Sequence, residues 1–131
     1  MELKIYEAGK IDIQLFHLIC SDITTDEVII TQERIDHIED HHPGDYQKYG
    51  KYIPEMLAFP DAVLRDKHAY TAILIKKFII ENHALRLTLR LHTVNDIYGR
   101  KNSILSFQYI RESEYRRLLK QKSCVYKKRG L

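Results

Sequence analysis

Residues 84–92 alternate between apolar and polar side chains without a break, and this pattern limits the possible folds more than any other part of the chain. Because successive side chains of a β-strand point to opposite faces, the segment predicts a strand with one leucine face and one polar face. The polar face carries Arg86, Thr88, Arg90 and His92. The leucine face needs a second layer that removes it from water, so we expect helices to cover that side of a sheet.

Three further segments show the two-residue period of strands, namely residues 62–65, 71–78 and 102–110. In the last segment, strict alternation places Ser106 and Gln108 on one side, together with Asn102 and Ile104. Pairing with residues 84–92 would bring Ser106 and Gln108 beside the arginine row. The alternative is an ordinary antiparallel sheet whose polar face only meets water.

Helical patterns precede and follow these strands. The expected helices span residues 32–42, 45–58 and 113–121, and a candidate short final strand spans residues 124–126. Thr31 is placed to cap the first helix, Pro54 either kinks the second or starts a new one, and Ser113 is placed to cap the last. Helices followed by adjacent strands indicate an α+β fold with a four-stranded, mainly antiparallel sheet, a C-terminal helix and a basic tail.

The chain of 131 residues has the size of one domain, in which residues 1–14 are a candidate peripheral extension. No apolar run approaches the ~20 residues that cross a bilayer, so no membrane association is expected. The two cysteines, Cys20 and Cys124, are too few for a disulfide scaffold or a four-cysteine zinc site. The sequence therefore predicts a cytoplasmic protein with free thiols.

Positive charge is concentrated near the C-terminal end. Residues 111–131 hold eight Lys or Arg residues against two acidic residues, whereas residues 1–110 hold 13 against 16. This asymmetry favours contact between the tail and a polyanion. Tyr115, Tyr126 and Lys127 are then candidates for base and phosphate contacts. A solvated tail without such a role is the alternative.

Three histidines lie on the first predicted helix. At 100° per residue, His42 shares the apolar stripe of Ile35 and Ile38. His37 and His41 form an i, i+4 pair on a neighbouring stripe. Three interpretations remain open: metal ligation by the pair, proton transfer near neutral pH, and a surface pair beside a core histidine. The H-E-x-x-H pattern of zinc hydrolases is absent, and neither a metal nor another cofactor is expected.

The stretch T-x-E-R-I-x-H-I-x-x-x-H-P-G-D-Y-x-x-Y at residues 31–49 resembles the phage-associated branch of the barnase–EndoU–colicin–RelE-like nucleases. An x-P-D turn before a strand, the arginine-rich strand, the stretch K-N-S-I-L-S-F and the closing basic segment fit the same family. The resemblance covers roughly residues 15–128. It implies N-terminal helices packed on a four-stranded antiparallel sheet, and a metal-independent ribonuclease of phage or prophage type. A toxin-like role is one option within this family.

The resemblance also assigns candidate site residues by position. The histidine motif of the family falls on His37 and His42, and its preceding arginine falls on Arg34. Its hydroxyl position on a late strand falls on Ser106, while His41 stands where an arginine is common.

Cleavage of RNA without a metal needs a base, an acid and a cation near the phosphate, and it leaves a 2′,3′-cyclic phosphate. The first candidate for proton transfer is His37. The expected catalytic residues are His37, His42, Arg90 and Ser106. The expected substrate-binding residues are Arg34, Lys76, Arg86, Thr88, Lys101 and Lys127.

RNA is the expected partner, and a phage protein, a host protein or a cognate inhibitor is a further candidate. A non-catalytic module that binds RNA or protein on a nuclease-like scaffold is the alternative function. A metal-dependent hydrolase that uses His37 and His41 is a third interpretation.

Overall fold

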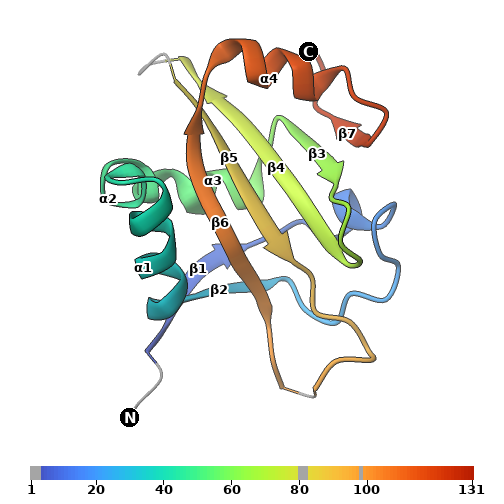
Figure 1. Ribbon diagram of the computed structural model, residues 1–131. Coiled ribbons are helices and arrows are strands. Elements are labelled where there is room, and N and C mark those ends of the chain that lie inside the picture. The colour runs from blue at the N-terminus through green and yellow to red at the C-terminus, as the bar shows by residue number, and fades with distance from the viewer. Residues whose placement is uncertain (1–3, 80–82, 98) are drawn as a thin grey trace.

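The computed structural model describes residues 4–79, 83–97 and 99–131 and shows an α+β fold (Figure 1). Within these residues, seven strands form one sheet in the order β1-β2-β6-β5-β4-β3-β7. The strands are β1 (Ile5–Lys10), β2 (Glu27–Thr31), β3 (Ala62–Arg65), β4 (Thr71–Phe78), β5 (His83–Arg90), β6 (Asn102–Ile110) and β7 (Cys124–Lys127). The helices are α1 (Gln32–His41), α2 (Asp45–Tyr49), α3 (Ile53–Ala58) and α4 (Glu112–Leu119), with short 3-10 turns η1 (Ile13–Phe16) and η2 (Gly50–Tyr52). No helix in the described ranges is long and apolar enough to cross a membrane.

The α+β class is confirmed, but the expectation of a four-stranded sheet is wrong. The four predicted strands form the centre of the sheet, and β1, β2 and β7 extend it at both edges. The pairs are antiparallel except for β2 and β6, which run parallel through Ile29 and Ser103. β7 corresponds to the short final strand predicted at residues 124–126. A parallel pair between segments that are far apart in the chain leaves no local sequence pattern, so the extension of the sheet through β2 to β1 was not expected.

The helix boundaries follow local signals with one exception. The Thr31 side chain accepts a hydrogen bond from the Arg34 backbone N–H at 3.2 Å, which confirms the predicted cap of α1. Pro54 lies in the first turn of α3, a position where its missing N–H costs nothing, so the expected long helix is divided. The expectation of a serine cap on the last helix is wrong, because α4 begins one residue earlier and Arg111 occupies the cap position.

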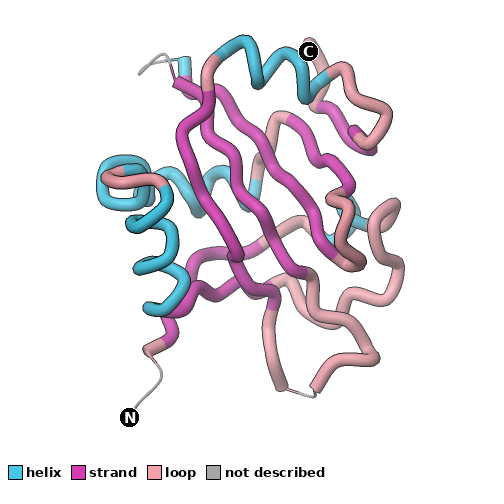
Figure 2. Tube along the Cα trace, viewed as in Figure 1, coloured by secondary structure: helices cyan, strands magenta, loops and turns pink. Residues whose placement is uncertain are grey.

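The two faces of the sheet are covered differently. Leu85, Leu87 and Leu89 of β5 are fully buried in the main core. This core also contains side chains from η1, α1 and α3, which confirms that helices cover the leucine face. On the opposite face, a smaller apolar cluster lies between the sheet and α4 through Tyr115 and Leu118. Figure 2 shows α4 at one end of the sheet, and Arg86, Thr88 and Arg90 on the polar face of β5 are partly exposed.

Asp61 is a buried carboxylate that holds the C-terminal segment against the sheet. One carboxylate oxygen accepts from the Tyr115 hydroxyl at 2.7 Å and from the Lys77 backbone N–H at 2.8 Å. The other lies 2.9 Å from Lys128 Nζ. Tyr115 is therefore buried and occupied, so the expectation that it contacts bases is wrong.

Candidate active site

The open part of the polar face is built by cross-strand pairs of β5 and β6. Thr88 lies opposite Ser106, and Arg86 lies opposite Gln108, as the sequence predicted. All four residues are partly exposed. Directly opposed side chains in an antiparallel pair have Cβ atoms roughly 5 Å apart, so hydroxyl and guanidinium groups alternate closely here.

A β-bulge in β6 brings Ser103 into this row. The register moves from Thr88–Ser106 to Leu89–Ile104, so Leu105 is the extra residue. Ile104 is consequently buried in the main core, and Ser103 comes to lie opposite Arg90. Strict alternation placed Ile104 on the polar side and Ser103 on the other, and that expectation is wrong because alternation does not reveal a bulge.

The two arginines of the row are held in place by neighbouring acids. Arg90 Nη2 lies 3.0 Å from Asp96 Oδ1, and its Nη1 donates to the Leu91 carbonyl. The Arg90 guanidinium also stacks over the Tyr70 ring at 5.2 Å. Arg86 lies 3.6 Å from Glu114 on α4. Both guanidiniums are therefore oriented, and each retains donors because five N–H groups are available.

Asp96 also fixes the loop that joins β5 to β6. Hydrogen bonds from the Thr93 backbone N–H, and then the nearby Arg90 charge, hold the pKa of Asp96 below its usual value. The carboxylate is thus an anion that stands beside Arg90 at neutral pH. A phosphate bound at Arg90 would therefore contact a guanidinium whose charge Asp96 already partly neutralises.

His92 does not belong to the exposed row, although alternation placed it there. β5 ends at Arg90, and the His92 ring is buried in the loop. Its Nε2 donates to the Ile97 carbonyl at 2.8 Å, because a carbonyl oxygen only accepts, and its Nδ1 lies 2.6 Å from the Thr24 hydroxyl. The backbone N–H of His92 donates to the buried Asn102 side chain. This imidazole therefore anchors the loop.

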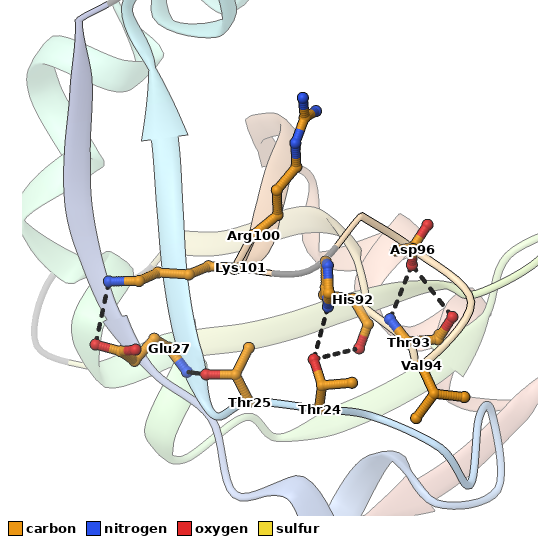
Figure 3. A pocket seen from close by; sticks show the side chains of 10 residues that line it. Thr24, Thr25, Glu27, His92, Thr93, Val94, Asp96, Arg100 and Lys101 are labelled. Atoms are coloured by element: carbon orange, nitrogen blue, oxygen red, sulfur yellow. Dashed lines mark hydrogen bonds and ion pairs between the residues drawn. The ribbon is translucent and has the colours of Figure 1, made fainter.

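Beside this loop lies a pocket of about 450 Å³, drawn in Figure 3. Its lining includes Thr24, Thr25, His92, Arg100 and Lys101. Lys101 Nζ forms an ion pair with Glu27 at 3.2 Å, whereas the Arg100 side chain is directed away from this pair. Sequence reasoning missed Arg100 and the two threonines, because a loop without periodic pattern gives no sign of what folds against it.

The histidines of α1 lie on a separate element. α1 contacts β6 and β2 and buries Ile38 in the main core. His37 and His41 are exposed, with ring centroids 4.1 Å apart, while His42 is partly buried, as predicted. α1 lies on the leucine side of the sheet, opposite the row, and no hydrogen bond or ion pair in the described part of the chain joins His37 to Arg90 or Ser106. Among the same residues, no three His, Cys, Asp or Glu side chains lie together as metal ligands.

The remaining predicted site residues lie apart from the row. Lys76 pairs in register with Leu85, on the leucine side, and its Nζ donates to the Phe59 carbonyl at 2.6 Å. Lys127 is exposed on β7, at the far edge of the sheet from β1. Arg34 lies in the first turn of α1, partly buried. The structure thus brings together Arg86, Thr88, Arg90 and Ser106, with Lys101 at the end of the row. It leaves Lys76 and Lys127 apart, and it places Arg34, His37 and His42 with α1 on the leucine side of the sheet.

Comparison with known proteins identifies a family that the chain matches over most of its length. The sequence profile of a family described as phage-Barnase-EndoU-ColicinE5/D-RelE like nuclease2 matches residues 3–127. No curated protein and no solved structure matched the chain.

Proposed function

The chain belongs to the phage-Barnase-EndoU-ColicinE5/D-RelE like nuclease2 family, and from this premise we propose that it cleaves RNA by general acid–base catalysis without a metal ion. The observation that carries the proposal is the row on β5 and β6, where the Thr88–Ser106 pair lies between Arg86 and Arg90. A planar guanidinium matches phosphate oxygens, and a hydroxyl orients an oxygen by hydrogen bonding. The row therefore carries the donor groups that a phosphodiester site needs.

In the proposed reaction, the ribose 2′-oxygen attacks the adjacent phosphorus and loses its proton to a base. The P–O5′ bond breaks, the 5′-oxygen takes a proton from an acid, and a 2′,3′-cyclic phosphate remains. Arg90 and Arg86 bind the non-bridging oxygens and stabilise the negative charge that develops on them. Ser106 and Thr88 orient the phosphate, because neither hydroxyl is engaged by another described residue.

His37 is the proposed proton-transfer group. Neither of its ring nitrogens is hydrogen-bonded to another described residue, and its ring is exposed. α1 packs on the leucine side of the sheet, so His37 must reach a phosphate on the polar side around the edge of β6, which pairs with β2 only at Asn102 and Ser103. His42 lies at the end of α1, where its partly buried ring supports the helix, and Arg34 and Lys101 are proposed to bind neighbouring phosphates.

The test is cleavage of mixed RNA in the presence of excess chelator. We expect cleavage with cyclic phosphate ends in the wild type, and about 100-fold lower rates in His37→Ala and Arg90→Ala. His17→Ala and Arg116→Ala are the matched controls, because both side chains are exposed and lie outside the row. Circular dichroism checks that each variant is folded.

Three results would contradict the proposal. Loss of activity on chelation would favour the metal-dependent interpretation, and RNA binding without cleavage would favour the non-catalytic module. Wild-type rates in both His37→Ala and Arg90→Ala would remove the roles proposed for these residues.

A further inference from the structure

The polar face of the sheet continues beyond the proposed catalytic row, across β2 to β1. Ser103, opposite Arg90, lies beside Ile29 of β2 in the parallel pair. Ile29 lies opposite Glu7, and Thr31 lies opposite Ile5, in the β1–β2 pair. The outer side chains of these strands line a groove of about 600 Å³. Its lining residues are Ile5, Glu7, Ile29, Thr31, Gly99, Arg100, Lys101 and Ser103.

The groove has an apolar floor and a cation, Arg100, whose guanidinium has no partner among the described residues. The floor is formed by Ile29, which is partly buried, and by Ile5, which is 52% exposed. Lys101 is paired with Glu27, but the exposed Arg100 guanidinium forms no hydrogen bond or ion pair with any described residue. Figure 3 shows Arg100 directed away from the Lys101–Glu27 pair. A guanidinium that the fold itself does not use is available for an anion.

The groove adjoins the place where the scissile phosphate is proposed to bind. Neighbouring strands of a sheet are about 4.8 Å apart, so Arg90 and Ile29 are separated by roughly 10 Å across β6. The groove is therefore within reach of the nucleotide adjoining a phosphate that contacts Arg90. The volume is in the range that accommodates a small ligand, roughly 300–1,000 Å³.

We propose that this groove is a second nucleotide-binding site for single-stranded RNA, in which Arg100 binds the phosphate and Ile5 and Ile29 contact the base. This proposal rests on the proposed function, because the RNA strand is assumed to extend from the scissile phosphate at Arg90. Its test measures RNA binding and does not require cleavage. Apolar side chains accept the face of any base, whereas a paired duplex does not expose its base faces. Glu7, exposed and without a described partner, opposes the phosphates and weakens binding.

The experiment measures binding of a short fluorescent RNA by anisotropy over a range of salt concentrations. Its riboses carry 2′-O-methyl groups, so it has no 2′-hydroxyl to react. Each phosphate contact contributes about 0.7 to the slope of log affinity against log salt for a single strand. We expect Arg100→Ala to bind more weakly and to lower that slope by about 0.7. Arg116→Ala, which removes an equally charged side chain from α4, is the matched control and should keep the wild-type slope.

A second variant tests the same groove by a change that is expected to strengthen RNA binding. Glu7→Gln removes a negative charge from the groove wall and is expected to tighten RNA binding severalfold. The proposal is overturned if Arg100→Ala binds with the affinity and slope of Arg116→Ala. It is also overturned if RNA duplex binds as tightly as the single strand with the same dependence on Arg100.

These outcomes separate the groove from the catalytic proposal. A protein that binds RNA through Arg100 but cleaves none would support the groove and contradict the proposed ribonuclease. A protein that cleaves RNA with cyclic phosphate ends, but binds it independently of Arg100, would support the ribonuclease and contradict the groove.

Discussion

Both ends of the polar face contain a carboxylate beside basic and hydroxyl side chains, but only at the covered end are these groups buried against one another. At the end covered by α4, the Asp61 side chain is only 2% exposed. Its carboxylate is engaged by the Tyr115 hydroxyl, the Lys77 backbone N–H and the Lys128 ammonium group. At the open end, Asp96 is 29% exposed and faces Arg90, while the hydroxyls of Thr88 and Ser106 have no described partner. Polar groups that satisfy one another stabilise a structure, whereas unsatisfied groups on an open surface are available to a ligand. We therefore expect mutations at the covered end to change stability and mutations at the open end to change activity.

The largest effect is expected from Asp61→Ala. The Tyr115 hydroxyl and the Lys77 backbone N–H would lose their acceptor inside the protein, which costs about 2–3 kcal/mol in the free energy of unfolding. Lys128 is 45% exposed, and its ammonium group can be hydrated instead, so losing its ion pair with Asp61 adds little to this cost. Urea unfolding followed by circular dichroism measures the change.

Asp40→Ala is the control for this prediction, because Asp40 is exposed at the end of α1. Its unfolding free energy should stay within about 0.5 kcal/mol of the wild type. Equal stability of Asp61→Ala and Asp40→Ala would show that the covered end does not depend on the buried carboxylate.

The next effect is expected from Arg90→Lys at the open end. Lysine keeps the charge but lacks the planar fork, so it cannot reproduce the pair of contacts that arginine offers to phosphate and to Asp96. We expect the rate of RNA cleavage to fall about tenfold, which corresponds to ~1.4 kcal/mol in the activation barrier. Single-turnover kinetics measure the rate, and urea unfolding should show a much smaller loss than in Asp61→Ala. Arg116→Lys serves as the control, and an unchanged rate in Arg90→Lys would argue against a forked phosphate contact.

The sequence predicted the centre of this face because its signals are local. The alternation in residues 84–92 is a property of one strand, and the leucine face is buried as expected. The bulge at Leu105 and the hydrogen bond between His92 and Thr24, 68 residues away, depend on contacts across the fold. The same holds for the parallel pair that extends the face to β1. Periodicity therefore identified the row, while the loop and groove beside it required the three-dimensional structure.

Asp61 also predicts how the stability of the covered end depends on pH. Burial alone would raise its pKa, but hydrogen bonds from the Lys77 N–H, Tyr115 and Lys128 hold the pKa below the ordinary value of 3.8. A carboxyl with a lowered folded-state pKa stabilises the protein fully above its unfolded pKa and loses that contribution as pH falls through the folded value. Unfolding free energy should therefore fall below about pH 4 in the wild type, and less steeply in Asp61→Asn. Identical acid dependence in both proteins would contradict this account.

The smallest effect is expected where the two ends meet, at Glu114. Its carboxylate lies 3.6 Å from Arg86 in the row and 3.3 Å from the exposed Arg117 on α4. Exposed ion pairs contribute little, so Glu114→Gln should change the unfolding free energy by less than about 1 kcal/mol. It also removes a negative charge beside the phosphate site, so RNA should bind about two- to threefold more tightly at low salt, with the gain lost at high salt. Glu112→Gln, on the same helix but paired with Lys77 and Arg116, is the matched control. An equal gain in both variants would mean that total charge, and not the release of Arg86, sets the affinity.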